Sequence, residues 1–186
     1  MQPIVIDKFI PAQVAKDLND FLRPLATPNP KGVLSKQLHV PWEKLLDHSI
    51  YEIDKDVYAF LNQLIASIQD EIDAPKDKIT INRALYQVLR EGEGLGHHAD
   101  GYGGVDGYGE IGQSALLYLT NDYEGGEILF YDGDILPDIT QQKSTAYKPD
   151  PGTLLHFRGD EHHHHSVNTV ISGERANIIL FFDIAK

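Results

Sequence analysis

Apolar residues in the first eighty positions recur at helical intervals. A short apolar run, Ile4 to Ile6, predicts an opening strand, and Pro11 stands where proline suits the start of a helix over 12–22. A longer helix is predicted over 53–72, with Asp54 placed to cap it. Its apolar stripe repeats at three- and four-residue steps: Val57, Phe60, Leu61, Leu64, Ile65, Ile68 and Ile72. We interpret this stripe as the face that packs against a sheet.

The hydrophobic period changes from Thr80 onward. Short β-like runs, separated by Gly, Pro, Asn and Asp, occupy 81–90, 114–121, 127–131, 153–157 and 176–183. Helices followed by many short strands indicate an α+β fold whose β-rich part is a barrel or jelly roll. No internal repeat or second-domain boundary is visible. We therefore predict one domain over 1–186, with 1–80 as helical support and 81–186 as the catalytic core.

Composition narrows the class of protein. The chain has 186 residues, enough for one domain with a buried core, and no cysteine, which excludes disulfides, thiolate metal sites and a cysteine nucleophile. Its net charge is −12 and it has no dense Lys/Arg cluster, so we expect no nucleic-acid partner. No signal sequence or membrane-spanning run is recognisable, so we expect a cytoplasmic protein without membrane association.

The first candidate for chemistry is a glycine-rich stretch that contains His98 and Asp100. On an extended strand these two positions share a face, so an imidazole and a carboxylate can meet one metal ion. A third ligand from a distant strand would complete a 2-His-1-carboxylate set, which favours non-haem Fe(II) with oxygen chemistry over structural zinc. His97 should point to the opposite face. A hydrogen-bonded surface pair is the alternative for His98 and Asp100.

The second candidate is the run of four histidines over 162–165. Strand alternation puts His163 and His165 on one face and His162 and His164 on the other, and the run by itself does not identify a ligand. Ten residues past His165, Arg175 opens a buried apolar run. A buried guanidinium is costly unless it is paired, so a dicarboxylate ligand is a suitable partner for it.

Four motifs follow one another between about Asn82 and Lys186. They are Gly92-x5-His98-x-Asp100, a strand, turn and strand over 117–130 that contains Gly125-Gly126-Glu127, a Pro-Gly strand over 148–157, and His165-x-Val-x5-Gly173-x-Arg175. Together they resemble the prolyl 4-hydroxylase-like branch of the iron(II)/2-oxoglutarate-dependent dioxygenases. The first eighty residues match that branch only loosely.

This resemblance implies a double-stranded β-helix and a role for each motif residue. His98, Asp100 and His165 would be the catalytic Fe(II) ligands. The resemblance selects His165 from the histidine run because the family places its basic residue ten positions after the metal histidine. Arg175 and Tyr118 would bind the far carboxylate of the cosubstrate 2-oxoglutarate, and Asn177 could assist them. The reaction would also consume O2, and ascorbate is an additional candidate cofactor.

One family feature is missing from the chain. Relatives often carry a tyrosine about nine residues before the metal histidine, and that position here is Leu89. Tyr86 is the nearest aromatic residue. By pattern alone, Tyr86 and Tyr118 are as well explained by packing as by cosubstrate binding.

The resemblance predicts an enzyme that hydroxylates an unactivated C–H bond, most simply of a prolyl residue in a peptide or protein. A free amino acid or other small molecule is the alternative substrate, and a non-catalytic, cupin-like metal-binding module is the alternative of another class. Loops over 101–112, with Tyr102 and Tyr108, and over 132–146 are candidate rims that contact the substrate. Ordinary surface loops are the other interpretation of these segments.

Overall fold

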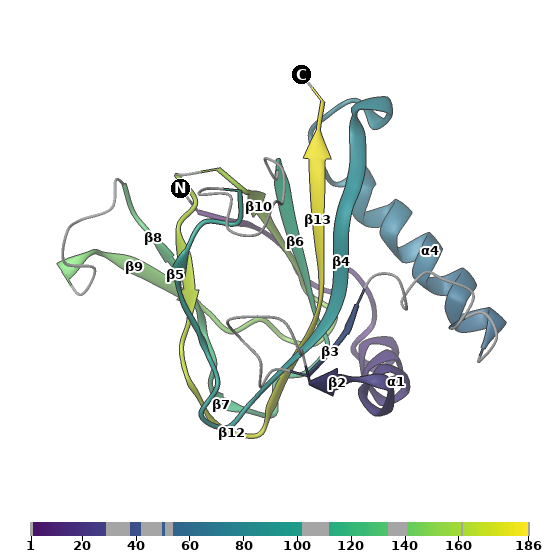
Figure 1. Cartoon of the computed structure of the whole chain (residues 1–186), viewed down its shortest axis with the longest axis horizontal. Helices are drawn as coiled ribbons and strands as arrows, with labels where there is room; N and C mark the ends of the chain where they lie inside the picture. Colours follow the sequence, from purple (N-terminus) through teal and green to yellow (C-terminus); the bar gives the residue numbers. More distant parts are fainter. Residues whose placement is uncertain are drawn as a thin grey trace.

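A computed structural model describes residues 2–28, 38–41, 50, 54–101, 112–133, 141–160 and 162–185. Two antiparallel sheets face each other, and two helices lie on the outer side of the larger one (Figure 1). Residues 102–111 of the predicted loop with Tyr102 and Tyr108, and residues 134–140 of the predicted loop over 132–146, lie outside the described residues.

The larger sheet has seven strands in the order β1-β10-β6-β13-β4-β3-β2. These are β1 (Ile4–Ile6), β10 (Leu154–Arg158), β6 (Gln113–Tyr118), β13 (Glu174–Ile184), β4 (Ile79–Arg90), β3 (Leu38–Pro41) and β2 (Thr27–Pro28). The smaller sheet has the order β5-β11-β8-β9, with β5 (Leu95–His98), β11 (His165–Val167), β8 (Ile128–Tyr131) and β9 (Ser144–Tyr147). A third ladder joins β12 (Val170–Ser172) to β7 (Glu124–Gly125).

The helices are α1 (Ala12–Leu22) and α4 (Lys55–Asp70), with 3-10 turns η1 (Arg23–Leu25) and η2 (Lys76–Lys78). Asp54 caps α4 as predicted, because its carboxylate accepts hydrogen bonds from the backbone N–H groups of Asp56 and Val57. The apolar stripe of α4 is buried against the large sheet, which confirms its interpretation as a packing face. No described helix has the length and apolar character needed to cross a membrane.

The large sheet separates two hydrophobic cores. On β13, Ala176, Ile178, Leu180 and Phe182 join the core under α1 and α4. Ile179 and Phe181 point the other way, into the space between the two sheets, where they pack with residues of β6, β8 and β10. This alternation gives β13 one structural face and one face toward the interior, and Arg175 lies on the interior face.

The expected α+β architecture with a double-stranded β-helix is confirmed, with differences at its edges. The first eighty residues are more than helical support, because they add β1, β2 and β3 to the large sheet. β9 was not predicted because three of its four residues are exposed, so its sequence lacks an apolar alternation. The strand predicted over 114–121 stops at Tyr118, and the one predicted from 176 begins at Glu174.

Candidate active site

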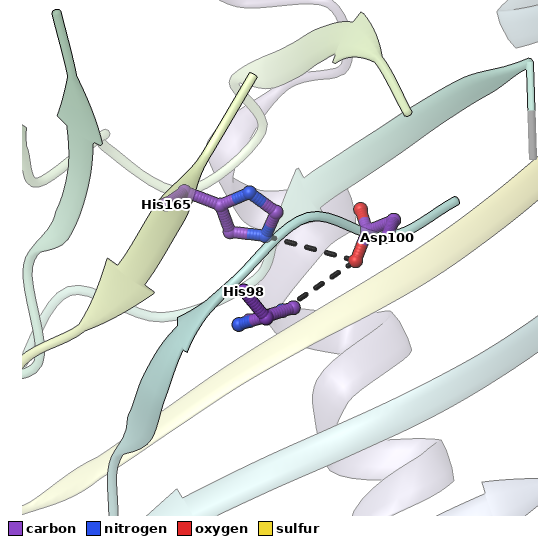
Figure 2. A group of neighbouring side chains, drawn as sticks. All are labelled: His98, Asp100 and His165. Carbon is purple, nitrogen blue, oxygen red and sulfur yellow. Dashed lines mark ion pairs between the residues drawn. The ribbon is translucent and has the colours of Figure 1, made fainter. Parts of the chain in front are cut away.

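His98, Asp100 and His165 come together between the two sheets (Figure 2). His98 ends β5 and His165 begins β11, and the two residues are direct partners across that ladder. Nε2 of His98 lies 3.5 Å from Oδ1 of Asp100, and Nε2 of His165 lies 3.7 Å from the same oxygen. One ligand atom from each residue falls within 4.8 Å of the others, so the three side chains could hold a single metal ion. The structure thus brings together the three residues that the sequence analysis selected.

Hydrogen bonds orient all three side chains. Nδ1 of His98 lies 2.7 Å from the carbonyl oxygen of Gly96, and Nδ1 of His165 lies 3.0 Å from that of His163. A carbonyl oxygen only accepts, so each Nδ1 carries a proton, and each Nε2, on the side of Asp100, is the atom that can bind a metal when it is unprotonated. Ser114 donates its hydroxyl to Oδ2 of Asp100 at 2.6 Å, which leaves Oδ1 on the side of the histidines. Two imidazole nitrogens and one carboxylate oxygen form a ligand set that fits a divalent metal ion.

The electrostatics of the three residues also suit metal binding. Burial would raise the pKa of Asp100, but His165, His98 and the Ser114 hydroxyl outweigh it and hold that pKa at about 2. Burial lowers the pKa of His165 to about 4, against the opposing effect of Asp100. Burial would also lower the pKa of His98, but the bond and charge of Asp100 and the Gly96 carbonyl raise it above its usual value. At neutral pH the site therefore has an ionised carboxylate and a neutral His165.

The other described histidines of the two motifs lie away from this cluster. His97 faces the opposite side of β5, as expected, where its ring stacks on His164 with centroids 4.7 Å apart and meets Tyr131 edge-on. His163 directs Nδ1 toward Oδ1 of Asp160 at 2.5 Å. His162 is exposed. Among the described residues, His165 is therefore the member of the four-histidine run that reaches Asp100.

A second buried polar group lies on the same interior face. Arg175 is 1% exposed, and its Nη2 donates to the Tyr118 hydroxyl at 2.9 Å. With the Asn177 amide turned so that its oxygen faces the guanidinium, this oxygen accepts from Nη1 and Nη2 at 2.6 and 3.1 Å. Within the described part of the chain Arg175 forms no ion pair with a carboxylate, and its Nε–H is buried without an acceptor. An unpaired buried cation indicates a site for an anionic ligand.

Tyr86 and Leu89 take no part in a polar site. Tyr86 lies on the helix side of β4, where its hydroxyl donates to Oδ1 of Asn19 on α1 at 2.8 Å. Leu89 is a fully buried member of the interior core. The hydrogen bond that some relatives form near this position therefore has no counterpart at Tyr86.

Two polar residues of the interior were missed by the sequence analysis. Ser114 shares the strand parity of Tyr118 on β6, so alternation could have placed it on the interior face near a ligand. Tyr123 lies in the turn between β6 and β7, where no periodicity predicts the direction of a side chain. It is nevertheless 3% exposed and belongs to the interior core.

Comparisons with known proteins agree with this geometry. The family profile of the 2OG-Fe(II) oxygenase superfamily matches residues 83–183. Prolyl 3-hydroxylase 2 of Homo sapiens is 32% identical over 71 residues, which are 38% of this chain and 9% of that protein. A Pseudomonas putida prolyl-4-hydroxylase has a TM-score of 0.67 at 18% identity and covers 100% of this chain and 94% of its own. A Trichoplax adhaerens prolyl hydroxylase, in complex with a hypoxia inducible factor peptide fragment, has a TM-score of 0.64 at 15% identity, over 98% and 84%.

The fold and the His-Asp-His cluster define the class as a double-stranded β-helix with a non-haem metal site. The chain belongs to the 2OG-Fe(II) oxygenase superfamily, whose profile covers more than half of its length. It is accordingly an oxygenase that depends on Fe(II), 2-oxoglutarate and O2. The expected class of enzyme and its dependence on Fe(II), 2-oxoglutarate and O2 are confirmed, whereas ascorbate stays a prediction.

Proposed function

We propose that the chain hydroxylates an unactivated C–H bond of a prolyl residue in a peptide or protein, with His98, Asp100 and His165 as its Fe(II) ligands. The observation that carries the proposal is the pairing of two features on one interior surface. A triad that could hold a metal ion and a buried guanidinium without a carboxylate partner among the described residues both adjoin the interior core. A 2-oxo dicarboxylate is the ligand that would satisfy both.

Each residue has a part that follows from its surroundings. Arg175 and Tyr118 would bind the far carboxylate and so orient the cosubstrate, because a guanidinium forms strong charge-assisted bonds to carboxylates. Phe130 and Phe157 pack around the His165 ring, at centroid distances of 5.5 and 4.8 Å, and keep water from that side of the site. Bound Fe(II) would supply the oxygen chemistry that converts 2-oxoglutarate to succinate and carbon dioxide and adds one oxygen atom to the substrate.

A cation–aromatic pair supports a peptide substrate at the metal end of the interior. The Arg83 guanidinium lies 4.5 Å from the centroid of the Phe181 ring. Phe181 is the strand partner of Ser114, whose hydroxyl binds Asp100, so this pair sits at the level of the ligands. Arg83 is only partly buried, and a guanidinium can donate to a peptide carbonyl of a bound substrate. The prolyl hydroxylases among the structural relatives, one of them holding a peptide, favour the same substrate class.

The test is turnover of a library of proline-containing peptides with Fe(II), 2-oxoglutarate, O2 and ascorbate, followed by mass spectrometry. We expect a peptide with one added oxygen atom on proline and an equal amount of succinate. His98→Ala and Arg175→Ala should abolish both products, whereas His163→Ala should retain them. Succinate formed with free amino acids but with no peptide would instead assign a small-molecule substrate. Metal binding without succinate under any condition would leave only a non-catalytic metal-binding module.

A further inference from the structure

The segment between β6 and β7 contributes to the interior core a tyrosine that the proposed function does not use. Tyr123 is buried, with 3% of its surface exposed, and its hydroxyl forms no well-directed hydrogen bond to any described residue. A buried phenol without a partner is costly, and Tyr hydroxyls inside proteins usually find one. This orphaned hydroxyl therefore suggests that a bound molecule supplies the missing acceptor.

Tyr123 belongs to the same polar group as Arg175 and Tyr118. Burial raises the pKa of Tyr123 to about 12, and the next groups to act on it are the Arg175 guanidinium, which lowers it, and the Tyr118 phenol, which raises it. Both tyrosines also belong to the interior core, together with Val170 and Leu89. A side-chain hydrogen bond from Arg175 also lowers the pKa of Tyr123, so the Tyr123 hydroxyl lies within reach of the guanidinium, although the contact lacks the geometry of a well-directed bond.

Arg175, Tyr118 and Tyr123 together have N–H and O–H groups that lack an acceptor. Arg175 has donated to Tyr118 and Asn177, and its Nε–H remains unused. The Tyr118 oxygen accepts from Arg175, so its own O–H is free to donate, and the Tyr123 O–H is free as well. Three unused donors around one buried cation match the two oxygens of a carboxylate, which have room for about four hydrogen bonds.

The surrounding backbone holds Tyr123 in place. Gly126 and Gly173 both have left-handed backbone angles, with φ of 68° and 79°. A Cβ on Gly126 would lie 3.0 Å from the Tyr123 ring, and one on Gly173 would lie 2.8 Å from its Cα, so both positions require glycine. Lys148 donates to the Tyr123 carbonyl oxygen, and its ammonium lies 4.7 Å from the ring centroid. The ring direction is thus built into the turn and is not the chance position of a loose side chain.

From these observations we infer that Tyr123 is a positioning residue for the cosubstrate, and that its hydroxyl donates a hydrogen bond to the far carboxylate of 2-oxoglutarate alongside Arg175 and Tyr118. This inference rests on the proposed function, because it assumes that 2-oxoglutarate binds with that carboxylate at Arg175. Tyr123 would make the enzyme select a 2-oxo acid that carries an anionic far end.

The test uses calorimetric titration of the whole protein loaded with Mn(II), which avoids turnover. Two ligands are compared: 2-oxoglutarate and 2-oxopentanoate, which has a methyl group in place of the far carboxylate. We expect Tyr123→Phe to weaken binding of 2-oxoglutarate about 10- to 100-fold, the value of a hydrogen bond to a charged group. Binding of 2-oxopentanoate should be no weaker than in the wild type. Tyr86→Phe is the matched control, because that hydroxyl bonds to Asn19 on the helix side of the sheet, and it should bind both ligands as the wild type does.

A thermal melt without ligand separates this role from a structural one. Ligand-free Tyr123→Phe should melt at the same temperature as the wild type or higher, because the variant no longer buries an unpaired hydroxyl. Equal 2-oxoglutarate affinity in the wild type and Tyr123→Phe, or equal weakening of both ligands, would overturn the role of Tyr123 and leave the proposed function intact. A wild type that binds 2-oxoglutarate no better than 2-oxopentanoate would overturn the carboxylate site itself.

Discussion

The three residues of the candidate metal centre, His98, Asp100 and His165, differ in their protonation near neutral pH. His165 has a pKa of about 4 and Asp100 one of about 2, so neither holds a proton near neutrality. His98 differs, because Asp100 raises its pKa above 6.5 in the metal-free protein despite its burial. A metal needs the neutral imidazole, so binding at that pH must displace the proton of His98.

This difference predicts the pH dependence of metal binding. Affinity for Mn(II) should rise with pH through the raised pKa of His98 and level off above it, with at most one proton released per ion. Calorimetry in buffers of different ionisation enthalpy measures that proton number. We expect a value above one half at pH 6.5 and near zero about two pH units above the pKa of His98. Proton release that does not change across this range would contradict the assignment of His98.

Ser114 predicts a second effect at the residue scale. Its hydroxyl fixes Oδ2 of Asp100 at 2.6 Å, so Ser114→Ala should let the carboxylate rotate away from the histidines. Residues that orient metal ligands commonly change metal affinity by about 10- to 100-fold, and we expect a loss in this range by calorimetry with Mn(II). Ser166→Ala is the matched control, because this buried serine bonds to Tyr131 and not to a ligand. An unchanged affinity in Ser114→Ala would mean that the strand backbone alone orients Asp100.

At the scale of elements, the sequence predicted those helices and strands that have a regular spacing of apolar residues. The stripe of α4, its Asp54 cap and the long strands β4 and β13 follow from apolar spacing, because burial of one face determines each of them. β9 and β3 did not follow, since β9 is mostly exposed and β3 ends in Pro41, which obscured its strand character. The same limit applies to placement in the interior. Strand alternation predicts the direction of His98, His165 and Arg175, whereas no periodicity predicts that of Tyr123, which lies between two strands.

A prediction at this scale concerns the link between η1 and the start of β13. Arg23 donates two hydrogen bonds to the Glu174 carboxylate, at 2.6 and 2.7 Å, and the bond to Arg23 is the main cause that lowers the pKa of Glu174 below 4.5. Both side chains are more than a third exposed, so Glu174→Gln should lower the free energy of unfolding at neutral pH by only about 0.5 kcal/mol.

The sign of the pH effect follows from the lowered pKa. The ionised form is favoured in the folded state, so the advantage of the wild type should be complete above pH 4.5 and disappear as the pH falls through the pKa of Glu174. Urea denaturation of both proteins at several pH values measures this difference. Asp20→Asn, which breaks the exposed pair with Lys16 on α1, should show no comparable loss. A difference between wild type and Glu174→Gln that persists at low pH would point to packing in place of charge.

For the whole molecule, Arg175 is expected to promote binding of the cosubstrate and to lower the stability of the ligand-free protein. It is a buried cation without a carboxylate partner among the described residues, so the ligand-free protein carries its desolvation cost. Arg175→Met should therefore leave the free energy of unfolding of the ligand-free protein equal or higher. In the presence of Mn(II), 2-oxoglutarate at 100 times its Kd should stabilise the wild type by about 2.7 kcal/mol and the variant not at all.

Chemical denaturation with and without 2-oxoglutarate measures both effects. Arg158→Met is the control, because that side chain is 69% exposed and pairs with Asp160 at the surface, and this variant should keep the full stabilisation by ligand. If ligand-free Arg175→Met lost more than about 2 kcal/mol, the bonds of Arg175 to Tyr118 and Asn177 would be structural contacts in their own right.

The two-faced character of β13 also restricts how the chain can change in length. Inserting one residue before Arg175 within the strand pairing would turn the guanidinium toward the core under α1 and α4 and turn Ile178 into the pocket. Inserting two residues would restore both faces but would shift Arg175 by about 7 Å along the strand and so change its position relative to the metal ligands. Neither insertion can be tolerated there without losing the fold or the pocket. Length variation among related chains should therefore collect in the loops, while the number of residues from His165 to Arg175 stays constant.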